Sequence, residues 1–347
     1  MYRFESDYLE GCHPDILERL QKTNYEQTLG YGEDPHCQRA AELIKAACNC
    51  PEAQVHFLVG GTQTNATVIS SILRPYQGVL CSDAGHIAVH ETGAIEHSGH
   101  KVLTLPSENG KIAAWQIDEA MEAHYNDFSR EHMVQPGMVY ISYPTELGTL
   151  YTKQELLDIR DSCRRWEMPL FIDGARLGYG LASPACDIRM DDLPQIADIF
   201  YIGGTKQGAL FGEAVVFNNI SLSNNFRYNI KQNGGMLAKG RLLGIQFETL
   251  FDSWLYLDIA RRADERAQII TDAFKAKGIE MLVDSPTNQV FPILTDEQLY
   301  TLAKDFGFEK WQKVDEDLTA VRFCTSWATD DDAVHALIKA IQNLQKY

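Results

Sequence analysis

Short apolar runs alternate with helix-like segments along the first two thirds of this chain, and this alternation restricts the possible folds more than any other feature. The apolar runs predict strands at residues 55–59, 78–82, 101–105, 138–142, 169–173, 198–203 and 213–217. Helices are predicted at about 36–48, 64–73, 86–97, 115–126 and 153–167. Strands joined through helices run parallel in one sheet, so we expect a mixed α/β fold with a mostly parallel central sheet flanked by helices.

Two neighbouring strands of this series end in charged residues. Asp173 closes one apolar run and opens the segment Asp173-Gly174-Ala175-Arg176, and the next run ends in Gly203-Gly204-Thr205-Lys206. The carboxyl ends of parallel strands meet at one edge of a sheet, where ligands bind. The sequence therefore predicts a carboxylate and an amine around one site.

A third feature adds a phosphate cradle to that site. The strand 55–59 runs into Gly60-Gly61-Thr62-Gln63 and then into a helix, and the N–H groups at a helix start bind phosphate. A pyridoxal phosphate enzyme needs these three parts: a carboxylate that keeps the ring nitrogen protonated, a lysine that forms the Schiff base, and a phosphate cradle. We therefore predict pyridoxal 5′-phosphate as the cofactor, with Lys206 as its covalent partner.

The pattern changes after about residue 230. A long helical stretch runs from 237 to 266 and onward, followed by a strand at 288–294, a helix from 296, a strand at 320–325 and a final helix. We expect the long helix to connect a large cofactor-binding domain, residues 1–254, to a smaller C-terminal α+β domain, residues 255–347.

Charge and hydropathy narrow the class of protein. The formal net charge of -17 disfavours nucleic acid and anionic membranes as partners, because their phosphates would repel the chain. No run of 18 apolar residues is present, and residues 1–7 do not read as a secretion signal. We expect a cytoplasmic protein that acts on a small molecule.

The eight cysteines are scattered, and none forms a Cys-x-x-Cys pair. Cys48 and Cys50 could be half of a metal site, but no second pair follows at zinc spacing. We expect reduced thiols and no bound metal.

With these residues in view, the chain resembles the L-threonine aldolase family of fold-type I pyridoxal phosphate enzymes, within the broader group of β-eliminating lyases. The resemblance covers nearly the whole chain. It rests on Ser6-Asp7, Tyr31-Gly32-Glu33-Asp34-Pro35, Gly61-Thr62-Gln63-Thr64-Asn65, His86 with Glu91 and Gly93, Asp173-Gly174-Ala175-Arg176, Lys206 and Val321-Arg322-Phe323. It implies the aspartate aminotransferase-like fold.

The resemblance also implies roles for individual residues. The cofactor-binding residues it implies are Gly61, Thr62, His86, Asp173, Arg176, Thr205 and Lys206. His86 would stack on the ring, and Asp173 would pair with its nitrogen.

Three further residues would hold the substrate carboxylate: Ser6, Arg176 and Arg322. A guanidinium suits this role because its bidentate geometry also fixes orientation. Clamping the carboxylate in the ring plane would expose the Cα–Cβ bond to retro-aldol cleavage, giving glycine and an aldehyde.

Two departures from the family pattern bear on substrate choice and assembly. Glu146 stands where the family has a histidine beside the substrate hydroxyl, so it could act as the base or contact a different side chain. Leu237 stands where the family has an arginine that reaches a neighbouring subunit's cofactor, and Lys231 or Lys239 could replace it. We predict Lys206, His86 and Glu146 as the catalytic residues.

These features predict a carbon–carbon lyase acting on a β-hydroxy-α-amino acid, assembled as a homodimer or homotetramer with shared active sites. Two alternatives stay open on the same residues. One is a different pyridoxal phosphate reaction, β-elimination or transamination, since the ring, lysine and carboxylate clamp are common to all of these. The other is a non-catalytic binding or regulatory protein that retains the cofactor site.

Overall fold

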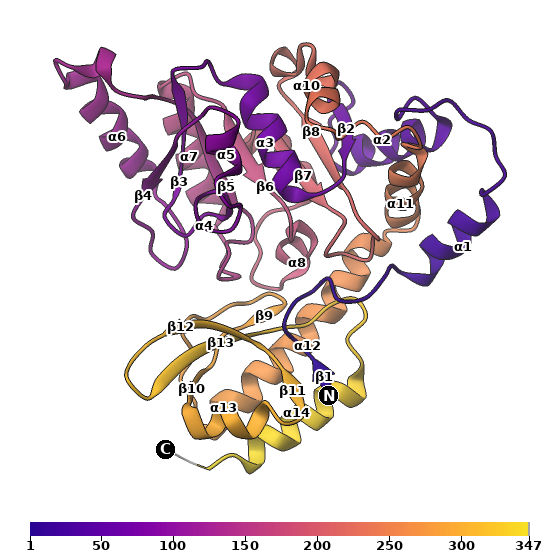
Figure 1. Cartoon of the computed structure of the whole chain (residues 1–347), viewed down its shortest axis with the longest axis vertical. Coiled ribbons are helices and arrows are strands. Elements are labelled where there is room, and N and C mark those ends of the chain that lie inside the picture. Colours follow the sequence, from indigo (N-terminus) through magenta and orange to yellow (C-terminus); the bar gives the residue numbers. More distant parts are fainter. Residues whose placement is uncertain (346–347) are drawn as a thin grey trace.

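The computed structural model describes residues 1–345, which form a large and a small lobe (Figure 1). The large lobe contains a seven-stranded sheet in the order β2-β8-β7-β6-β5-β3-β4. The strands are β2 (Gln54–Leu58), β3 (Gln77–Ser82), β4 (Val102–Leu105), β5 (Gln135–Ser142), β6 (Leu170–Asp173), β7 (Ile199–Gly203) and β8 (Glu213–Phe217). Strands β4, β3, β5, β6 and β7 pair in parallel, and only β8 runs antiparallel to its neighbours β7 and β2. The prediction of a mostly parallel sheet is confirmed.

Helices cover both faces of this sheet because alternate strand residues point to opposite sides. Leu170 and Ile172 join an apolar cluster with Ile159 on one face, whereas Phe171 between them joins a second cluster with Val68 on the other. The helices of this lobe are α1 (Pro14–Lys22), α2 (Pro35–Ala47), α3 (Gly61–Ile72), α4 (His86–Val89), α5 (Ala94–His97), α6 (Ala114–Asn126), α7 (Lys153–Arg165), α8 (Leu177–Ala182), α9 (Leu193–Ile196), α10 (Phe226–Gln232) and α11 (Arg241–Asp252).

Local sequence explains where two of these helices begin. Asp34 caps α2, since its Oδ1 accepts a hydrogen bond from the Cys37 N–H at 2.9 Å. Thr152 and Glu155 form a capping box on α7: the Thr152 hydroxyl accepts from the Glu155 N–H at 3.2 Å, and Glu155 accepts from the Thr152 N–H at 2.7 Å. Both starts place the following helix against the sheet.

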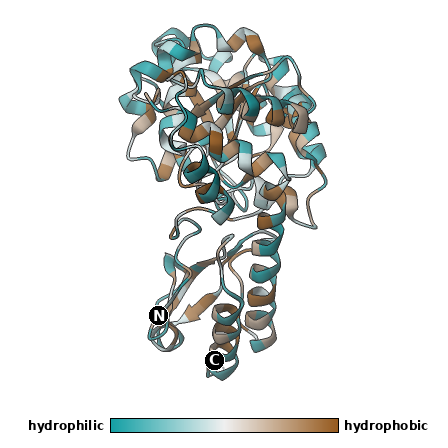
Figure 2. Ribbon diagram, turned by 90° about the vertical axis from the view of Figure 1, so that its right-hand side faces the viewer, coloured by the Kyte–Doolittle hydropathy of each residue, from teal (hydrophilic) through white to brown (hydrophobic). Residues whose placement is uncertain are grey.

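The small lobe has its own strands and apolar core. Its elements are β9 (Gln289–Val290), β10 (Ile293–Thr295), β11 (Phe306–Gly307), β12 (Glu309–Lys313), β13 (Leu318–Cys324), α12 (Leu255–Lys277), α13 (Asp296–Leu302) and α14 (Asp331–Asn343). Strand β1 (Tyr2–Arg3) pairs with β11, and Phe4 is buried in this second core. Figure 2 shows the small lobe below the large one, with a long helix passing between them. The predicted boundary at residue 254 falls between α11 and α12, and the domain assignment itself stays a prediction.

Three predicted elements are interrupted in the structure. The helix expected at 86–97 is two short helices, because Thr92 and Gly93 have positive φ of 52° and 71°. The long helix expected from 237 begins at Arg241 and breaks at Trp254, which also has a positive φ, 60°. The strand expected at 288–294 is divided into β9 and β10. Within residues 1–345, no helix is both long and apolar enough to cross a membrane.

Candidate active site

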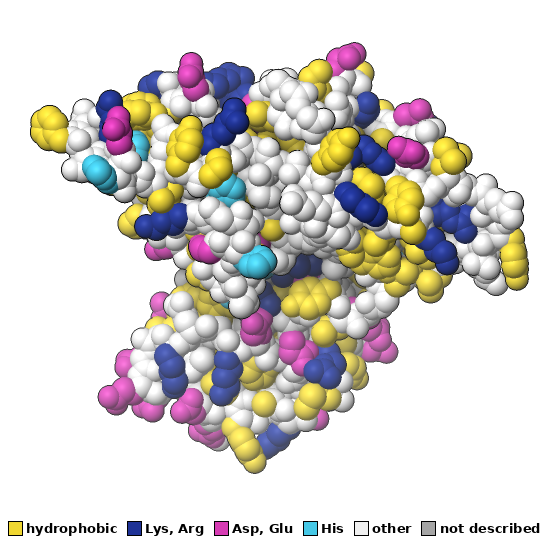
Figure 3. Space-filling model, turned by 45° about the horizontal axis from the view of Figure 1, so that its top comes forward, with side chains coloured by type: hydrophobic (Ala, Val, Ile, Leu, Met, Phe, Trp, Pro, Cys, Tyr) yellow, Lys and Arg dark blue, Asp and Glu magenta, His cyan; other side chains and the backbone are white. Residues whose placement is uncertain are grey.

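A cavity of about 310 Å³ opens at the carboxyl ends of β5, β6 and β7. The predicted residues in its wall are Gly61, Thr62, His86, Glu146, Asp173, Arg176, Thr205 and Lys206. Ser6 and Arg322 were also predicted for this site, but neither belongs to that wall. The face in Figure 3 is hollowed where the two lobes meet.

Asp173 ends β6 with its side chain only 3% exposed. Its Oδ1 accepts hydrogen bonds from the Tyr201 hydroxyl at 2.5 Å and the Ala175 N–H at 2.9 Å. Its Oδ2 accepts from the Tyr140 hydroxyl at 2.5 Å and from Asn65 Nδ2 at 3.0 Å. Burial alone would raise the pKa of this carboxyl, but nearby His86 and the tyrosine hydrogen bonds outweigh burial and lower it. The site thus holds a carboxylate that stays ionised while buried.

His86 lies at the start of α4, where a buried acid fixes its ring. Its Nδ1 is 2.8 Å from Glu91 Oε1, and the same oxygen accepts a hydrogen bond from Asn65 Nδ2 at 2.8 Å. Asn65 therefore links Glu91 to Asp173. The His86 side chain remains about one third exposed to the cavity side of this network, at 34%.

Glu146 is 8% exposed and follows β5 in the chain. Its Oε1 accepts hydrogen bonds from the Ser142 hydroxyl at 2.5 Å and the His86 N–H at 2.8 Å. Burial raises the pKa of this carboxyl, and the Ser142 hydrogen bond opposes that rise. A carboxyl with a raised pKa in a cavity wall is a candidate for a group that accepts or donates a proton during a reaction.

Lys206 follows the end of β7, and its amine enters the cavity wall. Within the described part of the chain its Nζ has no hydrogen-bond acceptor, and it lies 6.0 Å from the centre of the Tyr8 ring. Burial, reinforced by the Arg176 charge, lowers the pKa of this amine. A lowered pKa increases the fraction of neutral amine, which is the nucleophilic form.

The start of α3 also contributes to the cavity wall, together with Thr205 in the turn after β7. Among residues 1–345, the N–H groups of Gly61, Thr62 and Gln63 have no hydrogen-bond acceptor. Helix starts of this kind attract anions through their free donors and the helix dipole. A Cβ atom at Gly61 would lie 3.2 Å from the Tyr201 hydroxyl, so only glycine leaves this approach open.

Arg176 lines the cavity but already has a carboxylate partner. Its Nε and Nη2 donate to the two oxygens of Asp7 at 2.7 and 3.0 Å, and Asn288 also donates to Asp7 at 2.8 Å. Burial opposes the charge on Asp7, yet the neighbouring Arg176 and Lys206 charges lower the pKa of that carboxyl to about 2. The pair therefore stays ionised on both sides at neutral pH.

Arg322 lies on β13 and is 8% exposed. One arm donates to Gln289 Oε1 at 3.2 Å, and the other pairs with the carboxylate of Glu309, its cross-strand neighbour on β12. Gln289 in turn donates to the backbone carbonyl of Glu146 at 3.4 Å. Gln289 thus connects Arg322 to the segment that carries Glu146.

Comparison with known proteins now identifies the family. A family model described as beta-eliminating lyase matches residues 4–297. The chain belongs to the beta-eliminating lyase family. A threonine aldolase structure from Leishmania major is 44% identical, covers 99% of both chains and superposes with a TM-score of 0.96. The predicted resemblance to the threonine aldolases is confirmed.

A curated protein and a further solved structure also resemble the chain over nearly its whole length. A low specificity L-threonine aldolase from Pseudomonas sp. is 29% identical over 98% of this chain and 97% of its own length. An aspartate aminotransferase structure from Thermus thermophilus is 13% identical, covers 99% of this chain and 92% of its own, and has a TM-score of 0.72. The expected fold-type I, aspartate aminotransferase-like fold is confirmed.

Several residues of this lyase site were not predicted as site residues. Tyr8, Ser142, Tyr201 and Glu213 line the cavity. Of these four residues, only Glu213 could have been singled out from the sequence, because it is a charged residue at the start of a buried strand. The others show no distinguishing pattern in the sequence.

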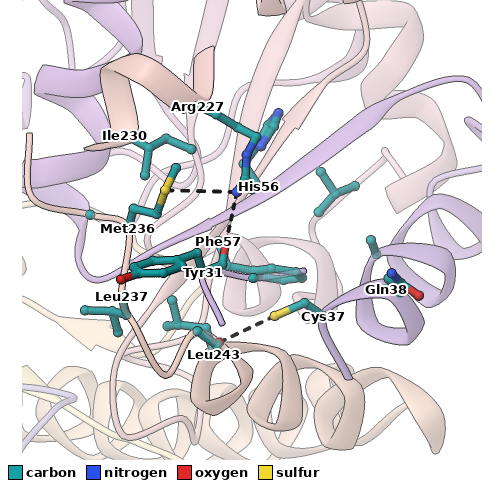
Figure 4. Close-up of a pocket in the computed structure, with 15 residues that line it drawn as sticks. Tyr31, Cys37, Gln38, His56, Phe57, Arg227, Ile230, Met236, Leu237 and Leu243 are labelled. Carbon is teal, nitrogen blue, oxygen red and sulfur yellow. Dashed lines mark hydrogen bonds between the residues drawn. The ribbon is translucent and has the colours of Figure 1, made fainter. Parts of the chain in front are cut away.

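A second cavity, about 170 Å³, lies between β2, α2, α10 and the segment at 234–240, as Figure 4 shows. Leu237 lines it, as does Arg227, whose Nη2 donates to the Tyr31 carbonyl at 3.2 Å. Lys231 Nζ lies 4.9 Å from the centre of the Tyr31 ring, whereas Lys239 is exposed. Arg227 is thus a further cation beside Leu237 that the sequence did not single out.

Proposed function

We propose that this protein is a pyridoxal phosphate-dependent aldehyde-lyase that cleaves a β-hydroxy-α-amino acid of the L-threonine or L-allo-threonine type to glycine and an aldehyde. The observation that carries the proposal is the pairing of Asp173 and Lys206 at the ends of adjacent strands, in a chain 44% identical to a threonine aldolase. Aldol cleavage is favoured over elimination and transamination because the similar proteins are named threonine aldolases.

The residues of the cavity fit pyridoxal 5′-phosphate. Lys206 offers an amine without an acceptor, the start of α3 offers free N–H groups, and Asp173 lies buried between them in the wall. Thr62 and Thr205 would hold the phosphate, Asp173 the ring nitrogen, and His86 one ring face. When bound, the cofactor supplies an electron sink for the pair released when a bond at the substrate Cα breaks.

The chain's own groups would orient the substrate and move its proton. Glu146, held by Ser142 and the His86 N–H, would take the proton of the β-hydroxyl as the Cα–Cβ bond breaks. Arg176 keeps Nη1 free of the Asp7 pair and could bind the substrate carboxylate with Arg322. Ser6 is 8% exposed and close in sequence to Asp7, which supports a secondary role in the same clamp.

Product analysis tests this function. Purified protein saturated with the cofactor is expected to release glycine and acetaldehyde in equal amounts from L-threonine or L-allo-threonine. Release of ammonia with a 2-oxo acid would support elimination instead, and transfer of the amino group to an added oxo acid would support transamination. A cofactor spectrum that does not change with any amino acid would support a non-catalytic protein.

Glu146→Gln tests the base. The amide keeps the volume and removes the proton acceptor, so we expect the cleavage rate to fall at least about tenfold and the ranking among β-hydroxy amino acids to change. Ser142→Ala is the matched variant: it removes a hydrogen bond that stabilises ionised Glu146, so the acid limb of the rate profile should move to higher pH. An unchanged rate and ranking in Glu146→Gln would make this residue structural.

Arg322→Ala tests the substrate clamp. Losing one partner of a desolvated charge pair costs about 2–5 kcal/mol, so KM should rise at least about thirtyfold while cofactor absorbance stays unchanged. Glu309→Gln removes the carboxylate that now occupies Arg322 and should lower KM. If Arg322→Ala binds glycine as well as the parent protein does, the clamp lies elsewhere.

We also propose a homodimer or homotetramer with shared active sites, in the cytoplasm. Tyr31 and Tyr228 are 46% and 78% exposed beside the second cavity, which supports a subunit contact there. Sedimentation analysis of the purified protein tests the assembly.

A further inference from the structure

Glu213 is a buried acid in the cavity wall that the proposed reaction does not use. It is the first residue of β8, pairs with Gly203 of β7, and is 3% exposed. Burial raises the pKa of this carboxyl to about 8. A buried acid beside an expected phosphate-binding site is unusual, because an ionised carboxylate would repel the negative charge of the phosphate.

The hydrogen bonds of Glu213 connect it to the predicted phosphate cradle. Its Oε2 accepts from the Gly204 N–H at 3.1 Å. Its Oε1 lies 2.8 Å from the Thr205 hydroxyl oxygen, which also accepts from the Gly212 N–H at 3.0 Å. Thr205 lines the same cavity and is one of the residues assigned to the phosphate.

The protonation of Glu213 decides what Thr205 can do. A hydroxyl has one proton and two acceptor positions. When Glu213 is ionised, Thr205 must donate its proton to Oε1, and nothing remains for a phosphate oxygen. When Oε1 carries a proton, it donates to Thr205, whose own O–H is then free to donate into the cavity.

The charged and titratable groups that face Glu213 come from several elements. Lys206, after β7, lowers the pKa of Glu213, and Asp173 on β6 raises it. Tyr201 on β7 and Tyr256 on α12 are fully buried, with pKa values raised well above the usual range by that burial, and stay neutral. Burial also lowers the pKa of the Lys206 amine, so the test has to separate the titration of Lys206 from that of Glu213.

We propose that Glu213 is a positioning residue that holds a proton when the cofactor phosphate is bound, and that this proton frees the Thr205 hydroxyl to donate to the phosphate. The inference rests on the proposed function, since it takes the phosphate to lie at Thr205. It predicts that phosphate affinity falls as pH rises through the pKa of Glu213, because ionised Glu213 both removes a donor and adds a repelling charge.

The test uses pyridoxine 5′-phosphate, which carries the phosphate but has no aldehyde to react with Lys206. The second pKa of its phosphate is about 6, so the charge of the phosphate group is constant above neutral pH. In the parent apoprotein the affinity is expected to fall by up to about tenfold per pH unit above the pKa of Glu213. Pyridoxine has the same ring and lacks the phosphate, so it reports any pH dependence that comes from the ring nitrogen. The ratio of the two affinities, phosphate ester over pyridoxine, is therefore the quantity expected to fall as Glu213 ionises.

Glu213→Gln is the decisive variant, because its amide copies the protonated acid: the carbonyl accepts from Gly204, and the NH₂ group donates to Thr205. We expect it to bind pyridoxine 5′-phosphate with the parent's affinity near neutral pH and to keep that affinity at alkaline pH. If the affinity of Glu213→Gln for pyridoxine 5′-phosphate falls with pH as much as the parent's does, the pH dependence belongs to Lys206. That result would overturn the proposal.

A second measurement follows the proton directly. Calorimetric titration at about pH 9, in two buffers of different ionisation enthalpy, should show that the parent takes up nearly one proton more on binding than Glu213→Gln does. Thr205→Val should weaken binding near neutral pH by about tenfold or more, and this deficit should shrink at alkaline pH, where Thr205 is already engaged.

The outcomes separate this inference from the proposed function. If pyridoxine and its phosphate bind equally well at every pH, the phosphate does not lie at Thr205 and both ideas fail. If the phosphate ester binds more tightly, but with no pH dependence and no proton uptake, Glu213 is only structural while the assignment of the cofactor and of glycine release stands.

Discussion

Borohydride reduction of the cofactor-saturated protein is expected to attach the cofactor to Lys206 and to no other lysine. The reason is geometric as well as chemical: Lys206 brings an amine with a lowered pKa into the cavity that Asp173 and the start of α3 line. Peptide mapping by mass spectrometry reads out the modified residue. Lys206→Ala should then lose the reducible cofactor band and reduce turnover by roughly 10³-fold or more, since the nucleophile has no substitute in the wall.

Two matched variants sharpen this test. Lys206→Arg keeps a positive charge at this position but cannot form the covalent bond with the cofactor. Its turnover should therefore be as low as that of Lys206→Ala, although the charge that Lys206→Ala removes is retained. Lys304→Ala removes an exposed lysine of the small lobe and should change neither labelling nor turnover. Labelling of another lysine, or full activity in Lys206→Ala, would show that the assignment is wrong.

The fold and the residues at strand ends could be predicted because they follow from local rules. Apolar runs of five or six residues identify buried strands, and the parallel-sheet rule places the residues that follow them at one edge. This rule brings Asp173 and Lys206 together from the sequence alone, whereas Glu146 was predicted only from the resemblance to the threonine aldolase family. The start of α3 was recognised from Gly60 and Gly61 by the same logic.

The partners of those residues could not be predicted because they come from distant segments. Asp7 reaches Arg176 from the N-terminus, and Gln289 joins Arg322 to Glu146 from the small lobe. Strand β12 was missed because its side chains are mostly exposed and polar, so it lacks the apolar pattern of a buried strand. Without β12, the contact between Glu309 and Arg322 had no basis in the sequence.

The interrupted helices show a second limit of sequence patterns. Trp254 gives no sign of a helix end, since a non-glycine residue with positive φ is uncommon. Its apolar neighbours continue a helical pattern across the break, and tertiary packing of α11 and α12 decides where each helix ends.

The charge on Asp173 is expected to be as important as the lysine for turnover. Its four hydrogen-bond donors are Tyr140, Tyr201, Asn65 and the Ala175 N–H, so truncation to alanine would leave buried donors unpaired and weaken the fold. Asn at this position keeps the shape and one of the two acceptor oxygens but removes the negative charge, so it tests the electrostatic contribution better than alanine does.

Asp173→Asn should therefore unfold at a temperature nearer to the parent's than Asp173→Ala does, yet turn over far more slowly than the parent. Breaking a buried charge pair with the ring nitrogen costs about 2–5 kcal/mol, which corresponds to a fall in kcat of roughly 30- to 4,000-fold. Cofactor affinity should also weaken, whereas borohydride labelling of Lys206 should persist at saturating cofactor, because the amine is unaltered. Asp7→Asn is the matched control: it also removes a buried carboxylate, but one paired with Arg176, so it should act mainly on KM. A parent-like kcat in Asp173→Asn would remove this carboxylate from the chemistry and leave it as the centre of a purely structural network.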